Sequence, residues 1–96
     1  MTRQRRSHAV RTIKQRANEG QYRMTDHALT EMDDDNLMEA DVIGAIVKGS
    51  LERKQTGDPR GPRYIFRGRS EDGRDVEVVC ALAGPKVSII TVYEVE

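Results

Sequence analysis

The first residue of this 96-residue chain that could do chemistry is His27. It follows Thr25 and Asp26 at the expected start of a helix, where free backbone N–H groups disfavour the imidazolium form and the carboxylate of Asp26 favours it. A neutral imidazole at such a position can act as a general base or hydrogen-bond a phosphate. A histidine that only caps or packs the helix is the simpler interpretation, and the sequence leaves both open.

A second group consists of arginines in and just after a predicted strand, namely Arg63, Arg67, Arg69 and Arg74. Side chains alternate along a strand, so the first three are expected on one side of it. Guanidinium groups suit a phosphate because they donate two parallel hydrogen bonds and stay charged. The equally weighted alternative is that they form ion pairs with nearby carboxylates. Those carboxylates belong to Glu71, Asp72, Asp75 and Glu77.

The third group is a pair of hydroxyls, Thr91 and Tyr93, in the last predicted strand. Their spacing predicts one shared face, together with Val87 and Ile89. Hydroxyls at the edge of a core are common, so a purely structural role is the alternative. The acidic residues near His27 follow no recognised ligand spacing, so we expect neither a bound metal nor a cofactor.

Three helices are expected before the strands. The first runs from Ser7, as N-cap, to Asn18, and residues 1–6 before it form a basic arm that we expect to be disordered. The second is capped by Thr25 and ends at the acidic run of residues 33–35. We expect its inward side chains to be Ala28, Leu29 and Met32.

The third helix is expected to begin with a capping box of Asn36 and Glu39. It should end at Gly49. Its apolar stripe of Val42, Ile43, Ile46 and Val47 predicts deep burial.

Extended segments follow at residues 50–54, 63–69, 74–83 and 87–95, and the loop of residues 55–62 lies between the first two. Short turns join the later segments, so they predict an antiparallel meander of three or four strands. The last two carry apolar residues on both faces and should be central. The prediction is an α+β fold in which residues 7–96 form a single domain.

Composition narrows the class of protein. The net charge is zero, but residues 1–23 carry seven basic and one acidic side chain, whereas residues 24–50 carry one basic and seven acidic. The single cysteine, Cys80, lies in an apolar run, which indicates a buried thiol and a reducing compartment. No apolar stretch reaches the roughly 20 residues that span a bilayer. We therefore expect a cytoplasmic protein that does not interact with membranes.

The order of the segments DHALTEM, LMEADVIGAIVKGSLE, GRDVEVVCAL and VSIITVY resembles a bacterial family of unknown function, the one numbered 4258. The resemblance covers roughly Tyr22 to Glu94 and implies a RelE- or barnase-like fold, similar to the RelE and MqsR type mRNA interferases. It implies a toxin-like, metal-independent ribonuclease with two partners, RNA and a cognate antitoxin protein. The residues implied as catalytic are His27, Arg67, Arg74 and Tyr93, and those implied as substrate-binding are Arg63, Arg69 and Thr91.

The chain departs from that family at Glu31 and Asp35, where arginines are common. Carboxylates lining an RNA cleft would repel the phosphate backbone. Either this acidic face points away from the substrate, or the chain is a non-catalytic protein- or nucleic-acid-binding module that keeps the fold.

Overall fold

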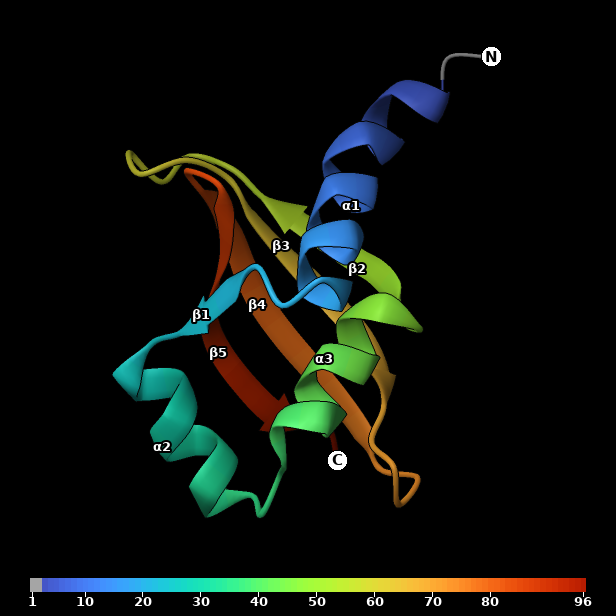
Figure 1. Ribbon diagram of the computed structural model, residues 1–96, viewed down its shortest axis with the longest axis vertical. Coiled ribbons are helices and arrows are strands. Elements are labelled where there is room, and N and C mark those ends of the chain that lie inside the picture. The colour runs from blue at the N-terminus through green and yellow to red at the C-terminus, as the bar shows by residue number, and fades with distance from the viewer. Residues whose placement is uncertain (1–2) are drawn as a thin grey trace.

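The computed structural model describes residues 3–96, with side chains from His8 onward, and has an α+β fold of three helices and five strands (Figure 1). The helices are α1 (Arg3–Asn18), α2 (Asp26–Asp34) and α3 (Glu39–Val47). The strands are β1 (Tyr22–Met24), β2 (Ser50–Gln55), β3 (Arg63–Arg69), β4 (Asp75–Ala83) and β5 (Lys86–Glu94). The predicted fold class is confirmed.

The five strands form one sheet in the order β1-β5-β4-β3-β2. Strands β2 to β5 make the predicted antiparallel meander, with β4 at the centre. Strand β1 is an addition that the sequence pattern did not predict. It pairs in parallel with β5, with Tyr22 opposite Val87. Three residues are too few to show an alternating pattern, so only the partner strand reveals β1.

Helices α1 and α3 pack on one face of the sheet, and α2 lies along the edge of β5 (Figure 1). The core between them consists of alternate side chains of the central strands together with the inward-facing side chains of the helices. Its largest fully buried members include Ile13, Ile46, Phe66, Val76, Val78 and Ile89. None of the helices described in residues 3–96 lies on the opposite face, which we call the uncovered face.

The strand register assigns residues to the uncovered face. In β3 they are Arg63, Ile65, Arg67 and Arg69, and in β4 they include Asp75, Glu77, Val79 and Ala81. In the outer strands they are Arg53 of β2, Ser88, Thr91 and Tyr93 of β5, and Arg23 of β1.

A β-bulge decides which side chains of β5 join this face. The register of β5 against β4 shifts between Val79 and Cys80, where an extra residue of β5 is accommodated. As a result Thr91 and Tyr93 lie on the uncovered face, whereas Val87 and Ile89 are buried under the helices. The prediction that these four residues share one face was therefore wrong.

The first two helices differ from expectation in detail. Helix α1 begins at Arg3, about one turn before the predicted cap Ser7, so Ser7 lies inside the helix. Residues 3–6 of the arm that was expected to be disordered belong to α1, and residues 1–2 lie outside the described residues. In α2 the predicted cap is confirmed, because the N–H of Ala28 donates to Oγ1 of Thr25 at 3.1 Å. Leu29, expected to face inward, is instead 50% exposed.

The predicted capping box of α3 was wrong, because Asn36 ends α2 instead of starting α3. Asn36 takes a left-handed conformation with φ of 57°, and the N–H of Leu37 reaches the carbonyl of Met32 at 2.8 Å. This is the bond pattern of a Schellman motif, which turns the chain so that Leu37 is buried. Helix α3 begins after Met38, whose N–H donates to the carboxylate of Asp41 at 2.8 Å.

Across residues 3–96 no helix has both the length and the apolar character needed to cross a bilayer.

Candidate functional site on the uncovered face

The centre of the uncovered face is a carboxylate, Glu77 of β4. The hydroxyl of Tyr93 donates to its Oε1 at 2.5 Å, and Nη2 of Arg53 lies 3.6 Å from the same oxygen. Glu77 is only 6% exposed, so its charge depends on these two partners. Its hydrogen bond is the main cause that raises the pKa of Tyr93, and burial adds to the effect.

From the sequence, Glu77 was expected only as an ion-pair partner of the arginines. Its position at the centre of the uncovered face was not predicted. The signal that could have pointed to it is a lone acidic residue inside the apolar run VEVVCAL. A charged side chain in a central strand is costly to bury unless it is paired.

Arg67 and Arg69 lie beside this centre and share one carboxylate. Nη2 of Arg67 is 3.2 Å from Oδ2 of Asp75, and Nε of Arg69 is 3.3 Å from Oδ1. Arg67 is also the cross-strand neighbour of Glu77. The ion pairs that the sequence suggested are thus present for these two arginines, but one carboxylate cannot neutralise both of them.

Arg63 lies toward the other end of β3, where the β2–β3 loop holds it. Its Nη2 is 3.5 Å from Oδ2 of Asp58. The same carboxylate accepts hydrogen bonds from the backbone N–H of Arg60 at 2.8 Å and from its guanidinium at 3.2 Å. These bonds with Arg60, followed by the charge of Arg63, lower the pKa of Asp58 to about 2.

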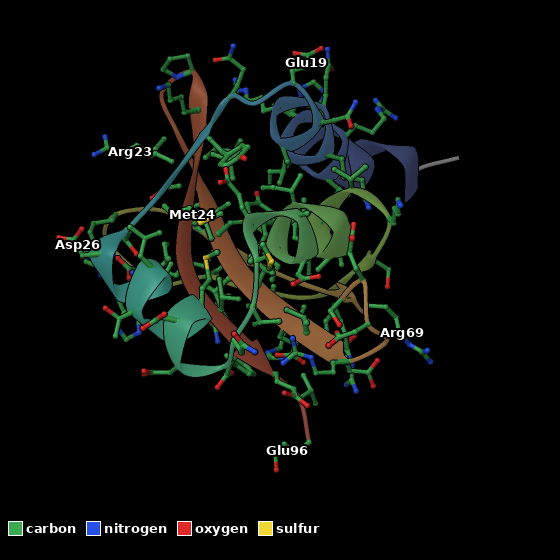
Figure 2. All side chains as sticks on the ribbon, turned by 60° about the horizontal axis from the view of Figure 1, so that its bottom comes forward. Glu19, Arg23, Met24, Asp26, Arg69 and Glu96 are labelled. Carbon is green, nitrogen blue, oxygen red and sulfur yellow. The ribbon has the colours of Figure 1, made fainter. Side chains whose placement is uncertain are left out.

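The charges of the uncovered face add up to a basic surface. Its arginines come from three different strands: Arg23, Arg53, Arg63, Arg67 and Arg69. The carboxylates on the face are those of Asp75 and Glu77. Arg23 and Arg69 project outward from the body of the molecule (Figure 2). Excess positive charge on a surface without a covering helix favours an anionic partner.

His27 lies at the edge of this face, on α2. Its Nε2 is 3.2 Å from Oε2 of Glu31, and its side chain is 65% exposed. The other oxygen of Glu31 accepts the backbone N–H of Val92 in β5 at 3.0 Å, and Asp35 accepts that of Glu94 at 2.9 Å. The carboxylates of Glu31 and Asp35 are therefore both bound to the edge of β5.

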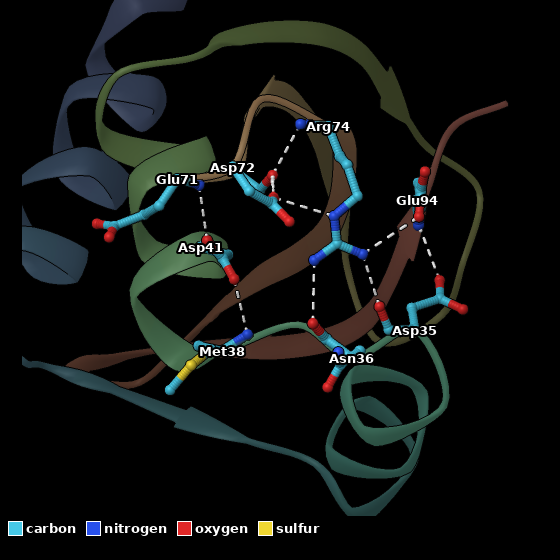
Figure 3. A network of polar contacts seen from close by, with 9 residues as sticks. Asp35, Asn36, Met38, Asp41, Glu71, Asp72, Arg74 and Glu94 are labelled. Carbon is cyan, nitrogen blue, oxygen red and sulfur yellow. Dashed lines mark hydrogen bonds and ion pairs between the residues drawn. The ribbon is translucent and has the colours of Figure 1, made fainter.

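Arg74 is tied to other groups on the helix side of the sheet (Figure 3). Its guanidinium donates to Asp72 at 3.0 Å and to Glu94 at 3.3 Å. It also donates to the backbone carbonyls of Asp35 at 2.7 Å and Asn36 at 3.0 Å. Arg74 thus joins the β3–β4 turn to the turn between α2 and α3.

The structure brings together only part of the residue set expected from the sequence. The uncovered face holds Arg63, Arg67, Arg69, Thr91 and Tyr93. His27 lies at the edge of that face, and Arg74 is separated from it by the sheet.

Metal ligands and the cysteine thiol are the remaining groups with possible chemistry. Among the side chains described from His8 onward, no group of three or more histidine, cysteine, aspartate or glutamate residues is placed to hold a metal ion. Cys80 is buried in the core, and burial raises the pKa of its thiol to about 12. The predicted buried thiol is confirmed.

Comparison with known proteins gives a match to a family model, described as "Domain of unknown function (DUF4258)", over residues 24–94. No curated protein and no solved structure matches the chain. The matched segment contains most of the uncovered face, including Glu77 and Tyr93.

Proposed function

Because the chain belongs to the DUF4258 family, described as one of unknown function, we propose its activity from its own site: a toxin-like ribonuclease that cleaves single-stranded RNA without a metal ion. The observation that carries the proposal is the contact between Tyr93 and Glu77, flanked by Arg53 and Arg67, at the centre of a basic surface. This arrangement unites a proton acceptor with two fixed positive charges.

The proposed reaction begins at the 2′-hydroxyl of the substrate. The proton of this hydroxyl passes to the oxygen of Tyr93 while the proton of Tyr93 passes to Glu77. The freed 2′-oxygen attacks the adjacent phosphorus in line, and the bond to the 5′-oxygen of the next nucleotide breaks. His27, at the edge of the face, is the proposed donor of a proton to that leaving oxygen. The products are a 2′,3′-cyclic phosphate and a 5′-hydroxyl.

The arginines have a separate task in this scheme. Charge builds up on the non-bridging phosphate oxygens during attack, and guanidinium groups held beside them stabilise it. Arg67 is the cross-strand neighbour of Glu77, and Arg53 contacts it, so both lie next to the proposed base. Arg74 has no part in this scheme, because its guanidinium is bound to the two turns that it joins.

Cleavage of labelled single-stranded RNA by the purified protein in the presence of EDTA tests the proposal. Tyr93→Phe and Glu77→Gln should each lower the rate about 10²-fold or more, the usual contribution of general acid–base catalysis. RNA with a 2′-deoxy group at the cleavage position should stay intact. Tyr22→Phe is the matched control, because Tyr22 also donates its hydroxyl to a glutamate, Glu39, but on the helix side of the sheet.

Two results would overturn the proposal. One is a folded protein that cleaves none of a set of RNAs covering all dinucleotide steps. The other is cleavage that Tyr93→Phe and Tyr22→Phe reduce equally, since the hydroxyl of Tyr93 would then have no special place in the reaction.

The second candidate is a non-catalytic module that binds nucleic acid or protein. The observation in its favour is that Arg67 and Arg69 are held by Asp75, as expected for a stable surface. A module of this kind binds RNA with the same affinity whether residue 93 is tyrosine or phenylalanine, and it leaves the RNA intact.

For the proposed ribonuclease, an antitoxin protein, if one is the partner, would have to cover the uncovered face to inhibit cleavage. Co-expression and co-purification with the neighbouring gene product would test that partner.

A further inference from the structure

A cavity of about 310 Å³ opens at one end of the uncovered face, away from Tyr93 and Glu77. Its floor includes Ala81 and Ser88, which are cross-strand partners with small side chains, and Ile90. The hollow exists because these side chains leave space that longer ones fill elsewhere on the face. A volume near the lower end of the range for small-molecule sites suits a single planar ring system.

Two arginines stand at the rim of this cavity, and both contact one carboxylate. Arg60 and Arg63 line it, and both are bound by Asp58. The loop that carries them is stiffened by Pro59 and Pro62. Because the single carboxylate of Asp58 pairs with two guanidinium groups, a net positive charge remains at the rim of the cavity.

A third arginine lies on the opposite side of the cavity. Arg23 of β1 is the register partner of Ser88, so the row across the sheet runs from Arg63 through the floor to Arg23. Figure 2 shows Arg23 and Met24 on opposite sides of β1, with Met24 toward the helices. The floor of small side chains therefore lies between positive charges on two sides.

The cavity is in line with the proposed catalytic centre. Arg63 and Arg67 are four residues apart on β3, which corresponds to about 13 Å along the strand. This separation exceeds the width of a single base, and an extended chain of a few nucleotides can span it. An extended strand of RNA could place one phosphate at Arg67 and a neighbouring base over the cavity.

We propose that this cavity is a base-binding subsite for single-stranded RNA, in which one nucleobase a few nucleotides or less from the scissile phosphate lies on the Ala81–Ser88 floor. The guanidinium of Arg63 stacks on the base or holds its phosphate, as arginine does in many RNA sites. The subsite rests on the proposed function, because it assigns the same face to the same substrate. Charge complementarity selects RNA over an uncharged peptide as the occupant.

The test uses Tyr93→Phe protein as the parent, so that RNA is bound without being cleaved, and fluorescein-labelled RNA pentamers as probes. Ala81→Leu fills the cavity and should raise the Kd by about tenfold, because a base can no longer lie on the floor. Ala40→Leu is the matched control, because Ala40 is exposed on α3 on the helix side, and its Kd should equal that of the parent. Arg63→Gln provides a second variant that leaves the floor unchanged, and it should reduce the salt dependence of binding by about one phosphate contact.

The outcomes separate the subsite from the activity. If Ala81→Leu and Arg63→Gln bind every pentamer as tightly as the parent, the subsite is wrong, even where Tyr93→Phe abolishes cleavage. If the two variants weaken binding but the protein with Tyr93 intact cleaves no RNA, the subsite stands and the proposed ribonuclease fails. If no pentamer binds the parent, both are overturned.

Discussion

The carboxylate of Glu31 on α2 accepts a hydrogen bond from the backbone N–H of Val92 on β5 at 3.0 Å. Asp35 does the same for Glu94. The residue spacing along the two elements explains why both hydrogen bonds form. Four residues of a helix rise about 6 Å, and two residues of a strand rise about 6.7 Å. Strand β1 pairs only with residues 87–89, so these carboxylates occupy the part of the β5 edge that β1 leaves unpaired and open to aggregation.

Replacing Glu31 by arginine should therefore destabilise this chain. Arginine has no acceptor for the N–H of Val92, and an unpaired backbone donor costs about 1–3 kcal/mol. We expect a loss of that size in the free energy of unfolding by urea. Asp33→Arg makes the same charge change at an exposed position of α2 and should change stability little. Equal effects of the two substitutions would show that the edge contact contributes nothing.

The close approach of α3 to β3 requires a glycine at position 68. A Cβ there would lie 2.7 Å from the Cα of Ala45 and 2.9 Å from its carbonyl oxygen. Gly68→Ala should lower the free energy of unfolding by about 1–3 kcal/mol or more through overpacking. Gly44→Ala, on the same helix with no atom within 4 Å of the added carbon, should be neutral or stabilising by up to about 1 kcal/mol. Thermal unfolding of the two variants gives the comparison, and a stable Gly68→Ala protein would contradict the packing argument.

Lys14 of α1 caps the end of α3. Its ammonium group donates to the carbonyls of Ile46 at 2.7 Å, Val47 at 3.1 Å and Gly49 at 2.6 Å. A positive charge also complements the negative end of the helix. Lys14→Met should lose about 1.5–3 kcal/mol of stability, the range for hydrogen bonds to charged groups.

Arg11→Met is the control for Lys14, because it removes a positive charge from an exposed position of the same helix. Hydrogen exchange provides a second measurement. In Lys14→Met the amides of the last turn of α3 should exchange faster, while those of α2 keep their rates.

Tyr22 gives a pH dependence whose sign can be worked out. Its hydroxyl donates to Glu39, and this bond is the main cause that raises the pKa of Tyr22 to about 12. The pKa of tyrosine in the unfolded chain is about 10, so the stabilising contribution is complete below pH 10 and is lost as the pH rises through about 12. The stability difference between the parent protein and Tyr22→Phe should therefore shrink over that interval. Ultraviolet titration of tyrosinate should show Tyr22 ionising at lower pH in Glu39→Gln, and an unchanged titration would contradict this assignment.

The sequence by itself determined the local elements, because the interactions that define them span only a few residues. The cap by Thr25, strand β3 from Arg63 to Arg69 and the turn after it follow from side chains that are near neighbours in the chain. The alternation of side chains along β3 also placed its arginines on one face correctly. The apolar character of the last two strands correctly predicted that they lie inside the sheet, although β5 is paired with β1 only at residues 87–89.

The tertiary structure alone decided what lies next to those elements. The bulge near Cys80 moved Tyr93 to the uncovered face, the pairing of β1 with β5 left an edge for Glu31 to bind, and the network of Arg74 removed it from the site. Each of these depends on contacts between segments far apart in the sequence, where a shift of one residue reverses the face of every side chain that follows. No local pattern carries that information, so the grouping of Tyr93 with Glu77 and Arg67 became visible only in the folded chain.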